Sequence, residues 1–178
     1  MGFDLPNAIS PEEKVFTLIN EKNFTKIALE VFRYQYFTNP VYKRYCDAVK
    51  RLPDSVTGIE LIPFLPIQFF KTFEIKSGAF NPEIVFKSSG TSGGSTSHHF
   101  VKDVAVYVKS FLVCFEKFYG HADGYCILGL LPSYLEREGS SLVYMVDDLI
   151  RKSGHPESGF YLHDHQKLRD TLCRLETA

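Results

Sequence analysis

Several features that would assign a chain to a familiar class are missing from this sequence. The 178 residues carry a formal net charge of -1, so no excess of positive charge points to nucleic acid or to an anionic membrane. The four cysteines form no C-x-x-C pair, which leaves neither zinc-finger nor thioredoxin spacing. No apolar run reaches the roughly 18 residues of a membrane span, and the N-terminus lacks the basic and apolar regions of a signal peptide. We therefore expect a cytoplasmic protein with reduced thiols and no membrane span.

What is present is sufficient for a globular core. Hydrophobic residues make up 44% of the chain, with 16 phenylalanines and 10 tyrosines but no tryptophan. A chain of this length buries a sizeable core, and this composition predicts one rich in aromatic rings. Internal repeats are not apparent.

Residues 1–55 are predicted to be helical. A capping box starts a helix at Ser10, a second helix covers about 25–37, and Asn39 followed by proline starts a third. These residues carry no evident chemistry, so we interpret them as a scaffold.

Residues 56–178 predict an α/β region. Strands are predicted at 83–87, 125–131 and 159–162, helices are capped by Asp103, Ser140 and Asp164, and Gly120 and Gly154 end two of these helices. The run 125–131 is apolar throughout, which predicts a central strand buried on both faces. This alternation indicates an α/β fold with a mainly parallel sheet and flanking helices. Because a crossover helix normally leads to another parallel strand, we expect residues 1–178 to be a single N-terminal segment of a larger domain.

The loop 88–97 is built almost entirely from serine, threonine and glycine, between a predicted strand and a predicted helix. It has little apolar surface to bury, but its glycines permit positive φ and close approach of a ligand to the backbone. Successive N–H groups in such a turn form an anion site, typically for phosphate. The candidate phosphate-binding residues are Ser88, Ser89, Gly90, Thr91, Ser92, Gly93, Gly94 and Ser97. A flexible Gly/Ser linker is the alternative interpretation.

The loop matches neither of two common nucleotide motifs. No register places a lysine after the second glycine of a P-loop, and no G-x-G-x-x-G can be drawn. It does contain the G-x-S-x-G pattern of serine hydrolases, with Ser92 as nucleophile and His163 or His165 as base. A serine hydrolase and a non-catalytic phosphate-binding α/β module therefore remain alternatives.

Two further stretches are candidates for the surroundings of the loop. The apolar segment 62–70 contains two prolines, permits a short helix from Pro66, and either packs in the core, braces the loop or lines an apolar pocket. Lys71 is a lone candidate anion ligand after it. The stretch 131–141 follows a predicted strand at the edge where α/β sheets bind ligands. The candidate site-lining residues are His98, Ser133, Tyr134 and Ser140. The histidine pairs have no evident third ligand, so no metal site is predicted.

The segment Ser88 to Gly94 resembles the Ser/Thr/Gly phosphate-binding loop of adenylate-forming enzymes, whose usual form is T-S-G-T-T-G-x-P-K-G. Its wider context resembles the acyl-protein synthetases of bacterial luminescence, also called long-chain-fatty-acid luciferin-component ligases. The matching features are Ile62-Pro63-Phe64-Leu65-Pro66 with Phe70-Lys71, Ser88-Ser89-Gly90-Thr91 with Ser97-His98, and Leu130-Leu131-Pro132-Ser133-Tyr134 before Ser140-Ser141-Leu142. Here Ser95-Thr96-Ser97 replaces the usual Pro-Lys-Gly, so no lysine follows the loop directly.

The resemblance implies a two-step reaction. A carboxylic acid would react with ATP, accompanied by Mg²⁺, to give an acyl-adenylate and pyrophosphate, and the acyl group would pass to an acceptor protein or other thiol. The loop would hold the β- and γ-phosphates through its N–H groups and hydroxyls. The family's adenine site, acid pocket, lid and acceptor cysteine would lie beyond Ala178, so we expect this chain alone not to be catalytically competent and its uncovered apolar surface to favour self-association.

Overall fold

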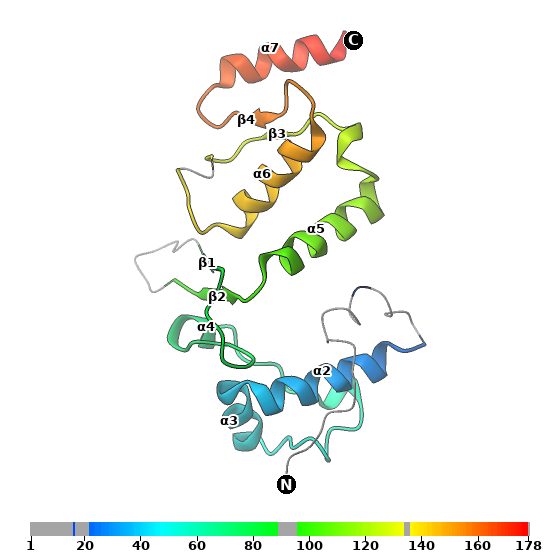
Figure 1. The fold of residues 1–178 in the computed structure, drawn as a ribbon, viewed down its shortest axis with the longest axis vertical. Coiled ribbons are helices and arrows are strands. Elements are labelled where there is room, and N and C mark those ends of the chain that lie inside the picture. Colours follow the sequence, from blue (N-terminus) through cyan, green and yellow to red (C-terminus); the bar gives the residue numbers. More distant parts are fainter. Residues whose placement is uncertain (1–15, 17–21, 89–95, 134–135, 178) are drawn as a thin grey trace. The chain divides into compact units, whose positions relative to one another are not determined.

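The computed structural model describes residues 16, 22–88, 96–133 and 136–177, which divide into two compact units. Unit 1 takes its described residues from 1–81 and 97–100. Unit 2 takes them from 82–96 and 101–178. Figure 1 shows helices as the main elements of both units. None of the described helices is both long and apolar enough to cross a membrane.

Unit 1 begins with the two helices that the sequence predicted after residue 22. Helix α2 spans Phe24–Thr38 and α3 spans Pro40–Ala48. Asn39 ends the first and caps the second, because its Oδ1 accepts the N–H groups of Val41 and Tyr42 at 3.1 and 3.0 Å. Pro40 occupies the first helical position, where a missing N–H costs no hydrogen bond. Of the helix predicted from Ser10, only Phe16 lies within the described residues, and it is helical.

An aromatic core holds unit 1 together. Phe32 and Tyr36 of α2 lie in one buried cluster with Tyr42 and Cys46 of α3 and with Val56. The Tyr42 hydroxyl donates to the carbonyl of Pro63 at 2.6 Å, which ties the apolar segment 62–70 to the core. Burial raises the pKa of this phenol above its ordinary value. The 3₁₀ helix η1 spans Ile59–Leu61 and the short helix α4 spans Phe69–Thr72, while Phe64 and Ile67 remain exposed.

Unit 2 follows the predicted alternation of strands and helices. Its elements are β1 (Ile84–Lys87), the end of β2 (His98–Val101), α5 (Val104–Tyr119), η2 (Ala122–Gly124), β3 (Leu128–Gly129), α6 (Ser141–Ser153), β4 (Gly159–Phe160) and α7 (His165–Glu176). Strand β2 is divided, since His98–Phe100 belong to unit 1 and Val101 to unit 2. The sequence did not predict this strand, because its two polar residues are followed by two apolar ones, without the alternation typical of a strand.

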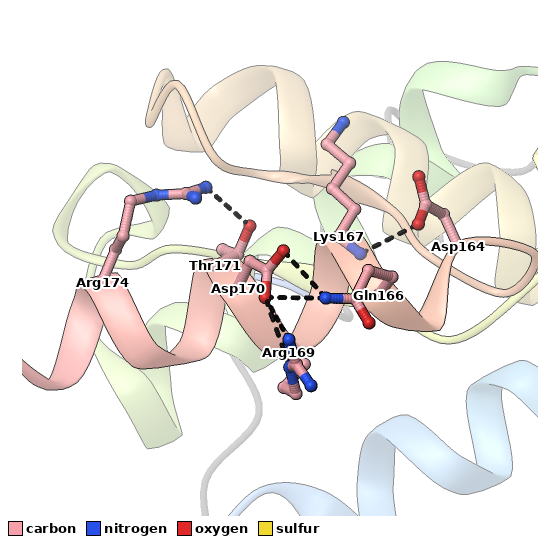
Figure 2. Close-up of polar contacts among 7 residues, drawn as sticks. All are labelled: Asp164, Gln166, Lys167, Arg169, Asp170, Thr171 and Arg174. Carbon is pink, nitrogen blue, oxygen red and sulfur yellow. Dashed lines mark hydrogen bonds and ion pairs between the residues drawn. The ribbon is translucent and has the colours of Figure 1, made fainter.

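The predicted helix boundaries of unit 2 are confirmed. Carboxylates cap α5 and α7, where Asp103 accepts the N–H of Ala105 at 2.8 Å and Asp164 accepts that of Lys167 at 2.9 Å (Figure 2). Ser140 caps α6. At the other ends, Gly120 and Gly154 follow α5 and α6 with φ of 84° and 61°.

The predicted sheet is only partly present. Strands β3 and β4 pair in parallel, with Leu128 opposite Gly159 and Gly129 opposite Phe160. A mainly parallel sheet is not seen among the described strands, which are two to four residues long.

The central strand predicted over 125–131 is wrong in length and burial. Only Leu128 and Gly129 are in strand conformation, and Leu130 is 56% exposed. An apolar run indicates a tendency to be buried, but the length of a strand depends on its partner, and β4 supplies only two paired residues.

Close packing beside β3 accounts for its glycine. A Cβ on Gly129 would lie 3.1 Å from the Phe160 ring and 3.2 Å from the Val146 side chain. Phe111 of α5, Ala122 of η2 and Leu149 of α6 form a buried cluster in unit 2. The absence of a side chain at position 129 therefore lets β4 and α6 approach the strand.

Candidate functional site

The described residues include only the two flanks of the Ser/Thr/Gly loop. Ser88 follows β1 and is exposed, while Ser97 precedes β2 and is partly buried. The other candidate phosphate-binding residues, Ser89, Gly90, Thr91, Ser92, Gly93 and Gly94, lie outside the described residues. The geometry that can be established is therefore that of the strand leading into the loop and of its neighbours within unit 2.

The end of β1 is fixed by aromatic packing. Phe86 is 5% exposed, and its ring centroid lies 4.9 Å from that of Tyr107 in α5 and 5.7 Å from that of Tyr144 in α6. The Tyr107 hydroxyl donates to the carbonyl of Ser141 at 2.8 Å, and burial raises the pKa of this phenol. Two helices thus hold the strand directly before the loop, so the loop starts from a defined position.

A backbone hydrogen bond joins β1 to the segment that follows β3. The N–H of Lys87 donates to the carbonyl of Gly139 at 2.8 Å. Gly139 is buried and has a φ of 82°, a conformation that residues with side chains rarely adopt. Ser140, a predicted site-lining residue, follows at once as the cap of α6, where its Oγ accepts the N–H of Val143 at 3.4 Å. This part of the predicted edge therefore lies beside the entrance of the loop.

Glu136 joins the same segment to the residues after β4. Its Oε2 accepts the backbone N–H of Ser133 at 2.7 Å and the Ser133 hydroxyl at 2.6 Å. Its Oε1 lies 3.0 Å from Nε2 of His163. These contacts, led by the Ser133 hydroxyl, lower the pKa of the Glu136 carboxyl.

The end of β1 and the segments that follow β3 and β4 are therefore linked in unit 2, through Lys87–Gly139 and Glu136–His163, although β1 and the β3–β4 pair belong to separate two-stranded sheets. In α/β folds ligands bind beyond the carboxyl ends of strands. We call the residues Lys87, Ser88, Ser133, Glu136, Gly139, Ser140 and His163 the carboxyl edge. Of the predicted lining residues, Ser133 and Ser140 belong to it, and Tyr134 lies outside the described residues.

Glu136 and Gly139 lie in the stretch 131–141 that the sequence indicated, but neither was among the predicted site-lining residues. The sequence does contain a signal for Glu136, because Ser133 and Glu136 have the S-x-x-E spacing in which serine and glutamate bond reciprocally to the backbone. No comparable signal marked Gly139, since its positive φ becomes evident only in the folded chain.

The remaining predicted residues, His98 and Lys71, belong to unit 1. His98 belongs to unit 1, where its ring stacks on Phe100 with centroids 6.3 Å apart, and Nζ of Lys76 lies 5.2 Å from the centroid of the Phe100 ring. Lys71 is exposed in α4. Among the described residues, no group of three or more His, Cys, Asp or Glu side chains could hold a metal ion.

The described residues give little support to the hydrolase interpretation. A nucleophile elbow requires a helix immediately after the serine. Here residues 96 and 97 are not helical, β2 follows, and the next helix begins only at Val104. His163, one of the two candidate bases, is in contact with Glu136 through Nε2, and His165 is an exposed residue at the start of α7.

The chain is similar to proteins of known description. A family model described as "Acyl-protein synthetase, LuxE" matches residues 6–109, a range that includes the whole Ser/Thr/Gly loop. A relative from Photorhabdus luminescens, a long-chain-fatty-acid–luciferin-component ligase, is 38% identical over 74 residues, which are 41% of this chain and 63% of the relative. The match thus spans less than two thirds of that relative's length. No solved structure matches the chain.

Proposed function

The chain belongs to the acyl-protein synthetase (LuxE) family, and on this basis we propose that it supplies the phosphate-binding loop of an ATP-dependent, AMP-forming acyl-activating ligase. The observation that carries the proposal is that the family match extends over the loop 88–97. The substrate would be a carboxylic acid, in keeping with the fatty-acid ligase among the relatives. The acceptor would be a protein or another thiol.

The proposed reaction has two balanced steps. An oxygen of the substrate carboxylate attacks the α-phosphorus of ATP, the bond to the bridging oxygen breaks, and pyrophosphate leaves with the electron pair. An acceptor thiol then attacks the acyl carbon, loses its proton and releases AMP. Mg²⁺ enters as part of the ATP substrate complex.

The protein's part in the first step is to position the phosphates. Transition states of this kind are stabilised by donors fixed in advance where charge develops. Backbone N–H groups of Ser89 to Gly94 and hydroxyls of Ser88, Thr91 and Ser92 are suitable donors for pyrophosphate. The aromatic packing of Phe86 supports this role, because it fixes the strand from which the loop departs.

We further propose that β3 and β4 are part of a larger, mainly parallel sheet in an adenylate-forming domain. Parallel sheets are normally covered on both faces and contain more than two strands. Leu130, at the end of β3, is 56% exposed, and Leu172 of α7 is 46% exposed. Additional strands and helices of the complete fold would cover such residues. Residues 1–55 would then be the helical region that precedes this α/β layer.

Binding of magnesium pyrophosphate to the 178-residue chain tests the proposed role of the loop. We expect calorimetric titration to detect binding, and Gly90→Val or Gly93→Val to weaken it by at least about tenfold, because a side chain would block positive φ and close approach of phosphate. Gly124→Val is the matched control, since nothing lies within 4 Å of a Cβ at that position. Equal affinities for all three variants would contradict the proposal.

Ser92→Ala separates the ligase from the hydrolase. If Ser92 only donates a hydrogen bond to phosphate, its loss costs about 1–2 kcal/mol of binding free energy. A nucleophilic serine would instead react with a fluorophosphonate probe in the parent chain and lose that labelling in the variant. We also expect little ATP–pyrophosphate exchange by this chain alone; rapid exchange would show that it contains a complete adenylation site.

A further inference from the structure

We propose that Glu136 is a positioning residue of the carboxyl edge, holding the segment after β3 in place between the end of β1 and the residues after β4. This inference rests on the proposed function, because the edge matters only if the neighbouring loop binds phosphate. It adds to that function a residue outside the Ser/Thr/Gly loop.

The contacts of Glu136 suit a bridging role. One carboxylate oxygen binds the backbone and hydroxyl of Ser133 at 2.7 and 2.6 Å, and the other binds His163 at 3.0 Å. Both oxygens are therefore used, one within the segment after β3 and one towards the segment after β4. Hydrogen bonds to a charged acceptor are stronger than those between neutral groups, so this carboxylate is well suited to fix a turn.

The contacts of Glu136 also restrain the segment that meets the start of the loop. Gly139 lies three residues further on, and its carbonyl accepts the N–H of Lys87, the residue before Ser88. Gly139 is buried, and the following Ser140 is fixed as the cap of α6. The segment is thus anchored at its end by Gly139 and Ser140 and in its middle by Glu136.

The contact between Glu136 and His163 should have only a moderate effect, because both side chains are exposed to solvent. The side chains of Glu136 and His163 are 48% and 70% exposed, and exposed ion pairs contribute little to stability. We therefore expect changes of about threefold to tenfold in local opening and in affinity. Direct electrostatics would act in the opposite direction, since removing a negative charge near an anion site favours anion binding. A positioning role therefore predicts weaker pyrophosphate binding when the Glu136 charge is removed, whereas a simple charge effect predicts tighter binding.

The experiment compares Glu136→Gln with the matched control Glu138→Gln, which removes the same charge from an exposed residue of the same segment. Two quantities are measured in the full chain: amide hydrogen exchange at Lys87 and the Kd for magnesium pyrophosphate. In Glu136→Gln we expect about threefold to tenfold faster exchange at Lys87 and a similarly weaker Kd, with exchange in α5 unchanged. In Glu138→Gln we expect unchanged exchange and an equal or tighter Kd.

A second pair of variants tests the contact with His163. His163→Gln keeps a side-chain donor that can reach Glu136, so it should approach the parent values, while His163→Ala should resemble Glu136→Gln. Unchanged exchange at Lys87 in Glu136→Gln, or a Kd that tightens as in the control, would overturn the positioning role. If the parent chain binds no pyrophosphate, the proposed function fails, whereas unchanged exchange at Lys87 in Glu136→Gln overturns the positioning role alone.

Discussion

Each unit has a buried apolar cluster of its own, and the two units differ in the contacts that supplement it. In unit 1, Phe32, Tyr36 and Tyr42 pack with Cys46 and Val56 in a buried aromatic core. In unit 2, the carboxyl edge and the last helix depend largely on polar contacts at partly exposed positions. Helix α7 is an example: Arg174 donates both to Thr171, which is fully buried, and to Glu157, which precedes β4 (Figure 2 for the first contact).

This difference is informative about function. Burial of aromatic rings gives a rigid unit whose stability depends on filled volume. Polar contacts at the edge of a sheet are individually weaker and can be rearranged by a bound anion or by pH. We therefore expect ligand binding and stability to be coupled in unit 2, which contains the carboxyl edge. Three substitutions test the difference between the two units.

The largest effect is expected from a cavity in unit 1. Phe32 is 2% exposed, so Phe32→Ala should reduce the free energy of unfolding by about 3–5 kcal/mol. Phe37 in the same helix is 70% exposed and serves as the control. Urea titration followed by circular dichroism measures both variants. A loss below about 1 kcal/mol for Phe32→Ala would mean that the aromatic cluster is not the main source of stability.

A smaller effect is expected from crowding in unit 2. Gly129→Ala would place a Cβ 3.1 Å from Phe160 and 3.2 Å from Val146, which should cost about 1–3 kcal/mol as β4 or α6 is displaced. Gly124→Ala is the matched control, because its Cβ would have no atom within 4 Å. Thermal unfolding of the pair measures the difference. Equal unfolding temperatures for the two variants would show that the residues beside β3 can accommodate the added Cβ without loss of stability.

The smallest effect is expected from the polar contacts of α7. Hydrogen bonding from Arg174 lowers the pKa of Glu157. The Glu157 carboxylate therefore stabilises the fold above the ordinary glutamate pKa of about 4.3, and this contribution is lost as the pH falls through the lowered value in the folded chain. Glu157→Gln should reduce the loss of stability on acidification. Glu176→Gln, at the C-terminal end of α7, is the control, and identical acid unfolding curves for parent and Glu157→Gln would refute the assignment.

Local signals in the sequence predicted most helix boundaries correctly. Asp103, Ser140 and Asp164 cap their helices because a short polar side chain can reach the first N–H groups whatever lies further away. Gly154 ends α6 for a similarly local reason, since it adopts the left-handed conformation at low cost. The motifs around the loop also indicated the family correctly, because they combine residue types with order along the chain.

The strands were predicted less well. The run 125–131 has the composition of a buried strand, yet only Leu128 and Gly129 find partners, and β2 was not predicted at all. Strand length and pairing depend on residues distant in sequence, which hydrophobic patterning does not specify.

By itself, the sequence determined the positions of the helix caps, the order of strands and helices in unit 2 apart from β2, and the Ser/Thr/Gly loop that relates the chain to its family. These depend on contacts between residues a few positions apart, or on residue types alone. Only the tertiary structure decided that the segment after β3 meets Lys87 through Gly139 and His163 through Glu136. Such contacts join residues roughly 25 to 50 positions apart, and they form only once packing has brought the end of β1 and the segments after β3 and β4 together.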